Sequence, residues 1–356
     1  MGRCILNSKP NGTAPAHSNV IERGLVSTGD QVGCVDPAAT LLFVINAASG
    51  TTDVDARRSV IEAALAERGR RGELLLCRPA ELTRVAGEAA AAAVDRRSAV
   101  IGVGGDGSLN TIAQAAHAAG CAMGVIPYGT YNYFARTHRI PTEPAAAVRH
   151  ALDARPMPVQ VAAINDRLFL VNASLGAYAD LLQDREAYKS RFGRSRWVAT
   201  IAACATVLRT QRRLRLEIEV GDTVRKVRTL TLFIGNNRLQ LQQFGAQPDD
   251  TVPGEPGNGS LAALMLRPIG TLSMIGLMLH GAMGDLREAA GVDALEFKRM
   301  VVKPRFLPVI RSVKVAVDGE VTWMRAPLDI RVLEQPLYLL HAAPASDLPY
   351  GSEAGA

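Results

Sequence analysis

A strand, a glycine-rich turn and a helix follow one another without interruption in the stretch Ser98-Ala-Val-Ile-Gly-Val-Gly-Gly-Asp-Gly-Ser-Leu-Asn-Thr-Ile-Ala-Gln-Ala-Ala-His-Ala-Ala-Gly120. Residues 98–103 are an apolar, β-rich run, which predicts a buried strand. Residues 109–119 have a helical period and end at Gly120, a common helix stop. The stretch therefore predicts one unit of a parallel α/β sheet.

The same alternation extends outward on both sides of this stretch. Short apolar runs predict further strands at 41–45, 73–77 and 122–126, and periodic runs predict helices at 54–68 and 80–94. Strands that alternate with helices indicate a doubly wound parallel sheet, in which ligands bind beyond the carboxyl ends of the strands.

After about residue 158 the pattern changes to hairpins and closely spaced strands. We predict hairpins over 159–171 and 214–234, then strands at 261–266, 297–302, 313–317 and 328–332, with helical runs at 196–210 and 270–289. This part is therefore expected to be mainly antiparallel and sandwich-like. The expected organisation is a loose tail (1–40), an α/β domain (41–157), a β-rich domain whose last strands could return to the first domain (158–342), and a second tail (343–356).

The turn Gly104-Gly105-Asp106-Gly107-Ser108 has the chemistry of a phosphate cradle. Three glycines let the backbone approach a phosphate closely, and the N-terminus of the following helix adds partial positive charge. The Asp106 carboxylate would repel phosphate unless a cation lay between them, so we expect Mg²⁺ there. The alternative is a tight turn in which Asp106 only caps the helix.

Composition limits the class of protein. The 356 residues carry a net charge of +6, which favours an anionic partner, and the five cysteines are widely spaced, which suits a reducing cytoplasm. The two long apolar runs, 197–208 and 269–279, are too short to cross a bilayer. The first run is flanked by many basic residues between 185 and 215, so we expect peripheral contact with an anionic membrane, or alternatively a core helix. Nucleic acid is not expected as a partner, because aromatic stacking residues and binding motifs are missing from this region.

Six motifs occur in an order that resembles the diacylglycerol kinase catalytic-domain family, which includes bacterial lipid kinases, sphingosine kinases and ceramide kinases. The match runs from about residue 41 to residue 342. The motifs are Asn46-x-x-Ser49-Gly50, Gly104 to Ser108, Pro127-x-Gly129-Thr130-x-Asn132-x-Phe134-Ala135-Arg136, Asn172-x-Ser174-x-Gly176, Gly235-Asn236-Asn237 and Asp318-Gly319-Glu320.

The resemblance implies a two-domain kinase that uses ATP and Mg²⁺ to phosphorylate a lipid alcohol such as diacylglycerol or a ceramide-like lipid. Glu320 would be the base that accepts the hydroxyl proton, Asp318 would orient the acceptor or a magnesium-bound water, and Asp106 would hold the metal. The expected nucleotide contacts are Asn46, Ser49, Gly50, Gly104, Gly105, Asp106, Gly107, Ser108, Asn110, Gly129, Thr130 and Asn132. Without the family, Asp318-Gly319-Glu320 is simply a β-turn. Asn172, Ser174, Asn236 and Asn237 are not expected to be catalytic, and they could instead satisfy loop backbone groups.

Several positions depart from the family pattern. Ala47 stands where a proline is common, Ser108 replaces Thr, and Tyr133 replaces Asp or His. Asn258 stands where relatives have Asp, which leaves a second metal site in doubt. Two other functions remain open: an NAD kinase, which shares the Gly-Gly-Asp-Gly turn, and a nucleotide or lipid sensor without turnover. An exposed β edge would also permit a homodimer.

Overall fold

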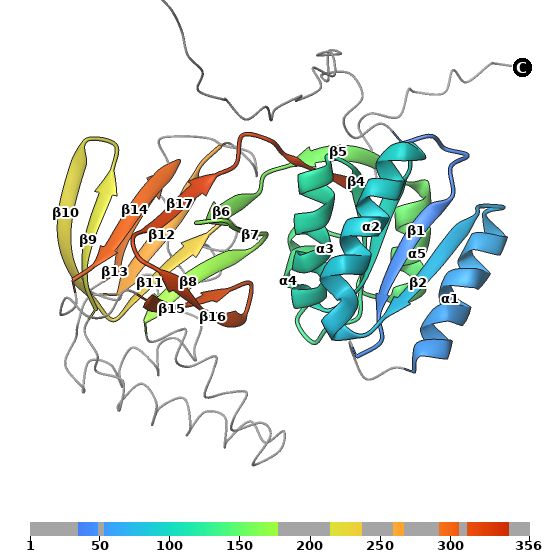
Figure 1. Cartoon of the computed structure of the whole chain (residues 1–356), viewed down its shortest axis with the longest axis horizontal. Helices are drawn as coiled ribbons and strands as arrows, with labels where there is room; N and C mark the ends of the chain where they lie inside the picture. Colours follow the sequence, from blue (N-terminus) through green and yellow to red (C-terminus); the bar gives the residue numbers. More distant parts are fainter. Residues whose placement is uncertain are drawn as a thin grey trace, which may run out of the picture.

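The computed structural model has two lobes side by side, one with helices around a sheet and one made of strands (Figure 1). It describes residues 35–48, 53–176, 214–236, 259–266, 292–305 and 312–341. Several sequence predictions concern residues outside these ranges. They are the helical runs 196–210 and 270–289, nearly all of the basic region 185–215, and the positions Ser49, Gly50, Asn237 and Asn258.

The first lobe is built on a six-stranded sheet in the order β2-β1-β3-β4-β18-β5. Strands β1 (Leu41–Asn46), β2 (Gly72–Cys77), β3 (Ala99–Gly104) and β4 (Ala122–Pro127) are parallel neighbours. They alternate with α1 (Val54–Glu67), α2 (Leu82–Asp95) and α3 (Asp106–Ala119), and a one-turn 3₁₀ helix, η1 (Pro79–Glu81), precedes α2. The predicted parallel α/β fold is confirmed.

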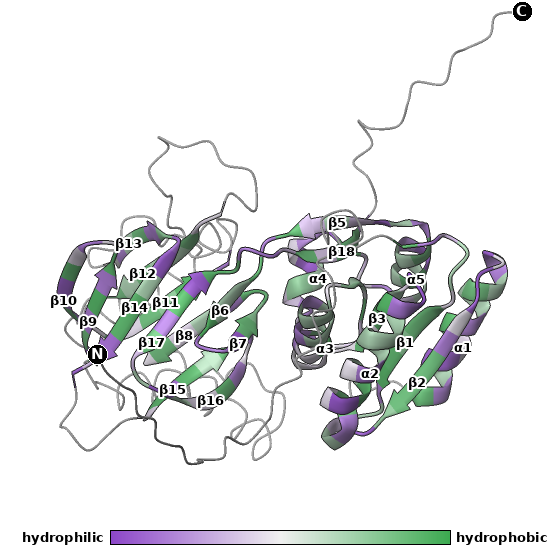
Figure 2. Ribbon diagram, turned by 45° about the horizontal axis from the view of Figure 1, so that its top comes forward, coloured by the Kyte–Doolittle hydropathy of each residue, from purple (hydrophilic) through white to green (hydrophobic). Residues whose placement is uncertain are grey.

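The core of this lobe lies on both faces of the sheet. Every residue of β1, β3 and β4 is buried, which explains why these runs are continuously apolar rather than alternating. On one face α2 and α3 contribute small alanines such as Ala89 and Ala113, and on the other face α1 and α5 (Pro144–Asp153) contribute Ile61 and Val148. Figure 2 shows the resulting hydrophobic colour along these strands.

Two strands far apart in the sequence complete this sheet. β18 (Leu337–His341) pairs in parallel with β4 and antiparallel with β5 (Arg155–Val159), so the C-terminal part of the described chain returns to the first lobe. Figure 2 shows β18 beside β5 at the junction of the lobes. The chain thus crosses between the lobes twice.

The second lobe consists of two antiparallel sheets that enclose one apolar core. One sheet has the order β10-β9-β14-β17-β6-β7 and the other has the order β13-β12-β11-β8-β15-β16. The first contains β6 (Ala162–Ile164), β7 (Arg167–Phe169), β9 (Leu214–Val220), β10 (Thr223–Thr229), β14 (Arg299–Pro304) and β17 (Leu328–Val332). The second contains β8 (Asn172–Gly176), β11 (Thr231–Gly235), β12 (Leu261–Leu266), β13 (Val292–Phe297), β15 (Ser312–Val317) and β16 (Glu320–Arg325).

Two runs that the pattern predicts as single strands are divided between these sheets. The run 224–234 breaks at Leu230, where β10 ends and β11 begins in the other sheet. The run 297–302 breaks at Lys298, between β13 and β14. At each corner the alternation of core-facing residues shifts by one position: Val227 precedes Leu232 and Ile234, and Leu295 and Phe297 precede Met300 and Val302. This shift is the local signal for the change of sheet, because side chains at alternate positions of a strand face opposite sides.

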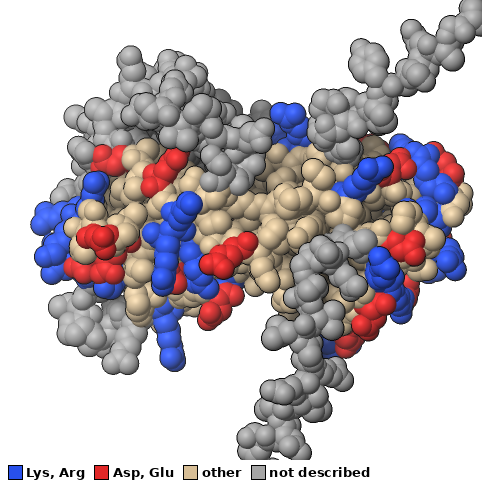
Figure 3. All heavy atoms as spheres, turned by 90° about the horizontal axis from the view of Figure 1, so that it is seen from above, with Lys and Arg blue, Asp and Glu red and all other residues tan. Residues whose placement is uncertain are grey.

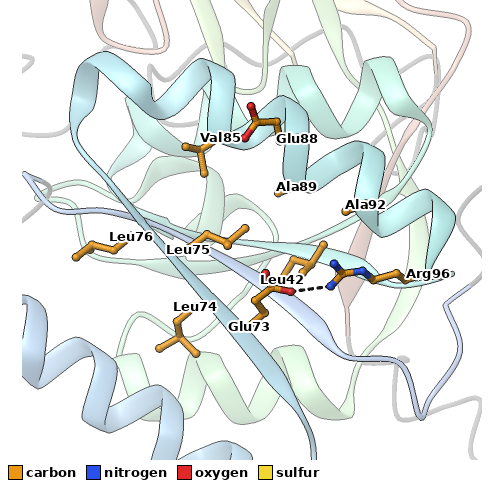
Figure 4. A pocket seen from close by; sticks show the side chains of 10 residues that line it. All are labelled: Leu42, Glu73, Leu74, Leu75, Leu76, Val85, Glu88, Ala89, Ala92 and Arg96. Atoms are coloured by element: carbon orange, nitrogen blue, oxygen red, sulfur yellow. Dashed lines mark hydrogen bonds and ion pairs between the residues drawn. The ribbon is translucent and has the colours of Figure 1, made fainter.

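A hollow of about 470 Å³ lies on the flank of the first lobe, between β2 and α2. Leu75, Leu76 and Ala89 line it, and the ion pair between Glu73 and Arg96 closes one end (Figure 4). None of the predicted site residues lines it.

Candidate active site

The turn after β1 is bonded directly to the glycine turn. The Asn46 side-chain amide donates to Ser108 Oγ at 2.9 Å, and both residues are buried. Asn46 Oδ1 accepts from the Ala48 amide at 3.1 Å, which shapes the start of the turn. Two of the predicted nucleotide contacts are therefore neighbours, although 62 positions separate them in the chain. The two residues that complete this motif, Ser49 and Gly50, are not described.

The glycine turn also touches the loop after β4, backbone against backbone. A Cβ built on Gly129 would lie 2.8 Å from Gly105 Cα, so neither position has room for a side chain. Asn132 has a left-handed backbone (φ 51°), and its Oδ1 accepts from the Gly129 amide at 2.8 Å. Thr130 is exposed at the tip of this loop. The glycines at 105 and 129 are thus explained by the packing of two loops at one edge of the sheet.

Asp106 is the first residue of α3 and points towards α4 (Tyr133–Thr137). Its Oδ1 accepts from the Phe134 amide at 3.4 Å. Burial raises the pKa of this carboxyl, and hydrogen bonds from the backbone amides of Phe134, Asn132 and Tyr133 oppose that rise. The carboxylate therefore bonds the first turn of the neighbouring helix, α4.

Glu320 reaches the glycine turn from the other lobe. It begins β16, directly after the turn Asp318-Gly319, and a Cβ built on Gly107 would lie 2.1 Å from its Oε1. The carboxylate therefore rests against the backbone of Gly107. Its other oxygen, Oε2, accepts from Arg167 Nη2 at 2.7 Å, and the Glu320 side chain is 54% exposed. The turn is also the hairpin that the dipeptide Asp-Gly predicts, so both interpretations of this motif describe the same segment.

Asp318 has a different environment from Glu320. It is buried, its Oδ1 accepts from the Val171 and Asn172 amides, and its Oδ2 accepts from the Leu170 amide and the Asn110 side chain, all between 2.7 and 2.9 Å. Burial raises the pKa of the Asp318 carboxyl, and these four bonds oppose the rise. Because four donors surround the two oxygens, the geometry suits a residue that holds the lobes together.

Asn110 is fully engaged in the same contact. Its amide nitrogen donates to Leu168 O and to Asp318, and its oxygen accepts from Gln114 Nε2 at 2.9 Å. Asn110 is on α3 of the first lobe, whereas Leu168 is on β7 of the second. The Asn110 side chain, which was predicted to contact nucleotide, thus joins α3 to the β lobe.

The asparagine and serine side chains of the remaining motifs differ in their hydrogen bonding. Asn236 satisfies backbone groups, since its amide donates to Gln160 O and Leu170 O. In contrast, Asn172 Oδ1 and Ser174 Oγ are buried without a hydrogen-bond partner. These two residues are on the same face of β8, because side chains alternate along a strand. Buried polar atoms usually have partners, so this pair has spare hydrogen-bonding capacity.

Arg57 is a residue near the site that the sequence motifs do not include. It is 1% exposed, its Nη1 donates to Asn46 O at 3.1 Å, and its guanidinium lies 5.1 Å from the centre of the Tyr128 ring. It therefore joins the loops after β1 and β4. The sequence does contain one sign of its importance. Arg57 is four residues before Ile61 on the buried face of α1, where a charged residue is unusual.

Residues 40–164 match the family model described as the diacylglycerol kinase catalytic domain. This part of the chain is therefore similar to the catalytic domain of the diacylglycerol kinase family. This domain contains the glycine turn and the loops after β1 and β4, but the matched range ends before Asp318 and Glu320. The likeness of those two residues to the family is therefore carried by their motif.

Curated relatives of this domain are bacterial proteins named "Probable lipid kinase YegS-like". One from Klebsiella pneumoniae (strain 342) is 37% identical over 81 residues, 22% of this chain and 27% of the relative. One from Pectobacterium atrosepticum is 29% identical over 145 residues, 39% of this chain and 48% of the relative. The aligned regions thus span between about a quarter and a half of the relatives' length.

A solved structure extends the likeness in fold to both lobes. The crystal structure of a "putative diacylglycerol kinase" from Bacillus anthracis (strain Sterne) superposes with a TM-score of 0.65, and the match covers 86% of this chain and 98% of that one. The sequence identity is 20%, so this likeness concerns the fold. The predicted combination of a parallel α/β lobe with an antiparallel β lobe is confirmed.

Proposed function

We propose that this protein is a kinase that transfers the γ-phosphate of ATP to the hydroxyl group of a lipid alcohol. The observation that carries the proposal is the contact of Glu320 with Gly107, which joins a carboxylate of the β lobe to the glycine turn of the diacylglycerol kinase catalytic domain. Diacylglycerol or a ceramide-like lipid is the acceptor that the family favours.

The glycine turn would bind the phosphates. Successive backbone amides from 104 to 108 and the N-terminus of α3 provide hydrogen bonds and partial positive charge, and the close packing of Gly105 on Gly129 keeps side chains out of this edge. Asn46 and Ser108 would contribute polar side chains there.

Among the described residues of the first lobe, Asp106 is the carboxylate that would hold a magnesium ion at this edge. No group of three or more His, Cys, Asp or Glu side chains that could hold a metal occurs within the described ranges. A single carboxylate still suits Mg²⁺, which is usually bound by one or two carboxylates together with substrate phosphates and water. When bound, the ion would neutralise charge on the transferred phosphoryl group.

Glu320 would act as the general base. It accepts the proton from the acceptor hydroxyl, the hydroxyl oxygen forms a bond to the γ-phosphorus, and the bond from that phosphorus to the bridging oxygen of ADP breaks. The carboxyl group is half-exposed and can return its proton to solvent. Asp318 would not take part directly, because its oxygens already accept four hydrogen bonds.

The acceptor would approach from the β lobe. Asn172 and Ser174, whose buried side-chain oxygens lack partners, are on β8, which is paired to the strand that leads into Asp318. They would supply hydrogen bonds to the polar part of a lipid. No helix within the described residues is long and apolar enough to span a membrane. Peripheral contact with an anionic membrane surface is proposed on a separate ground, the many basic residues of the sequence between 185 and 215.

The test is to incubate the purified chain with Mg²⁺, γ-labelled ATP and diacylglycerol or ceramide in mixed micelles, with NAD in a parallel reaction. We expect labelled product in the chloroform phase, and Glu320→Gln should lower turnover at least about 100-fold with little change in ATP affinity. Asp106→Ala should reduce both magnesium-dependent ATP binding and turnover. Label found only in NADP, or ATP binding without any transfer, would contradict the proposal.

A further inference from the structure

Arg167 forms an ion pair with the proposed general base. Its Nη2 donates to Glu320 Oε2 at 2.7 Å, and the Arg167 side chain is 28% exposed. Most exposed ion pairs contribute little to stability, and this one has no obvious structural purpose. Its position is unusual because the other oxygen of the same carboxylate rests against Gly107 of the glycine turn.

Two hairpins hold Arg167 and Glu320 in a fixed relation. Arg167 begins β7, directly after the turn at Asn165, and the Asn165 side chain donates to Arg325 O at 3.1 Å and accepts from the Asp329 amide at 2.9 Å. Arg325 is the last residue of β16, the strand that Glu320 begins. The hairpin that carries Arg167 is thus anchored to the strand of its partner.

The residue after Arg167 on β7 is hydrogen-bonded to α3. Leu168 O accepts from the Asn110 side chain of α3 at 3.0 Å, and this bond is buried. Arg167 is therefore on a hairpin that is bonded both to β16, the strand of Glu320, and to α3. Such support suits a side chain that needs a defined position.

The ion pair between Arg167 and Glu320 would affect the electrostatics of ATP binding. A carboxylate against the glycine turn would lie beside the phosphates of bound ATP, and like charges at short range repel strongly. A guanidinium bonded to the carboxylate offsets that repulsion, because it is always charged and has several donors in a fixed plane. The carboxylate could then remain at the phosphates while it accepts a proton.

We propose that Arg167 is a positioning residue that holds Glu320 at the glycine turn and neutralises its charge, so that the base and ATP can occupy this edge together. The inference rests on the proposed function. It predicts that the effect of Arg167 on ATP binding passes through Glu320 and disappears when Glu320 carries no charge.

The test measures binding of Mg·ATP by titration calorimetry to the full chain and to Arg167→Met, Glu320→Gln and the double variant. We expect Arg167→Met to raise the dissociation constant about tenfold, and the double variant to bind within about threefold of the wild-type protein. Arg299→Met is a matched control, because Arg299 forms an exposed pair with Asp329 at 2.8 Å on the same lobe, and it should bind ATP normally.

Turnover separates positioning from simple packing. At saturating ATP, Arg167→Met should lose about tenfold or more in kcat with an unchanged lipid KM, and Arg167→Lys, which keeps the charge, should recover part of the loss. Unchanged ATP binding and kcat in Arg167→Met would overturn the inference. A double variant that binds as weakly as Arg167→Met would also overturn it, because Arg167 would then act directly on the phosphates. Failure of the proposed function would appear differently, as a wild-type protein that does not bind Mg·ATP or phosphorylate lipid.

Discussion

Gly107→Ala is the substitution that tests the contact between the two lobes most directly. The added methyl group would lie 2.1 Å from Glu320 Oε1 and 3.0 Å from its Cδ. An ordinary contact begins near 3.4 Å, so the carboxylate must retreat by about 1.3 Å. The Glu320 side chain is 54% exposed, and a partly exposed ion pair such as that with Arg167 contributes little to stability, so the carboxylate can move at little cost in stability.

Stability and turnover should therefore separate in this variant. Gly107 is in the first turn of α3, and replacing a helical glycine by alanine usually stabilises a protein by up to about 1 kcal/mol. We expect an unchanged or slightly higher melting temperature. Displacement of a catalytic group by 1 Å can reduce the rate about 100-fold, so we expect kcat to fall between about 10-fold and 100-fold. Initial rates of label transfer from ATP to lipid measure the second quantity.

Gly87→Ala provides the matched control. Gly87 is on α2, and a Cβ built there meets nothing within 4 Å. This variant should gain similar helical stability and keep the wild-type rate. The reasoning is refuted if Gly107→Ala retains full turnover. It is also refuted if Gly107→Ala lowers the residual rate of Glu320→Gln by the same factor as in the wild-type protein, because the defect would then arise in the phosphate turn.

Two further predictions concern stability. Asp318→Asn should lower the free energy of unfolding by about 3 kcal/mol or more, because the new NH₂ group would face hydrogen-bond donors that bond a carboxylate oxygen in the wild-type protein. Denaturant unfolding measures this loss. A loss of turnover at unchanged stability would contradict the prediction. Burial, with a smaller effect of His341, lowers the pKa of His138 to about 4 from 6.5. The stability from this neutral histidine is therefore complete above about pH 6.5, and up to about 3 kcal/mol of it is lost as the pH falls towards 4. Unfolding curves at several pH values should show this loss, and His138→Phe should flatten it; an equal slope in that variant would reject the assignment.

The sequence by itself predicted the first lobe well. Strands 41–45, 98–103 and 122–126 were recognisable because they are buried on both faces and therefore read as short apolar runs between helices. The glycine turn was recognisable because its glycines meet local demands, such as the close approach of residue 105 to Gly129. In both cases the physical cause acts on neighbouring residues or on one loop, so a local pattern records it.

Tertiary structure decided which distant residues meet. The family resemblance implied that both Asp318 and Glu320 act at the catalytic centre, yet four hydrogen bonds surround the first and the second rests on Gly107. Arg167 had no motif, and its pairing with Glu320 spans 153 positions. The changes of sheet at Leu230 and Lys298, and the return of β18 to the first lobe, likewise depend on contacts between distant strands. A local sequence pattern specifies which face of an element is buried, but the partner of that face is selected only when the whole chain packs.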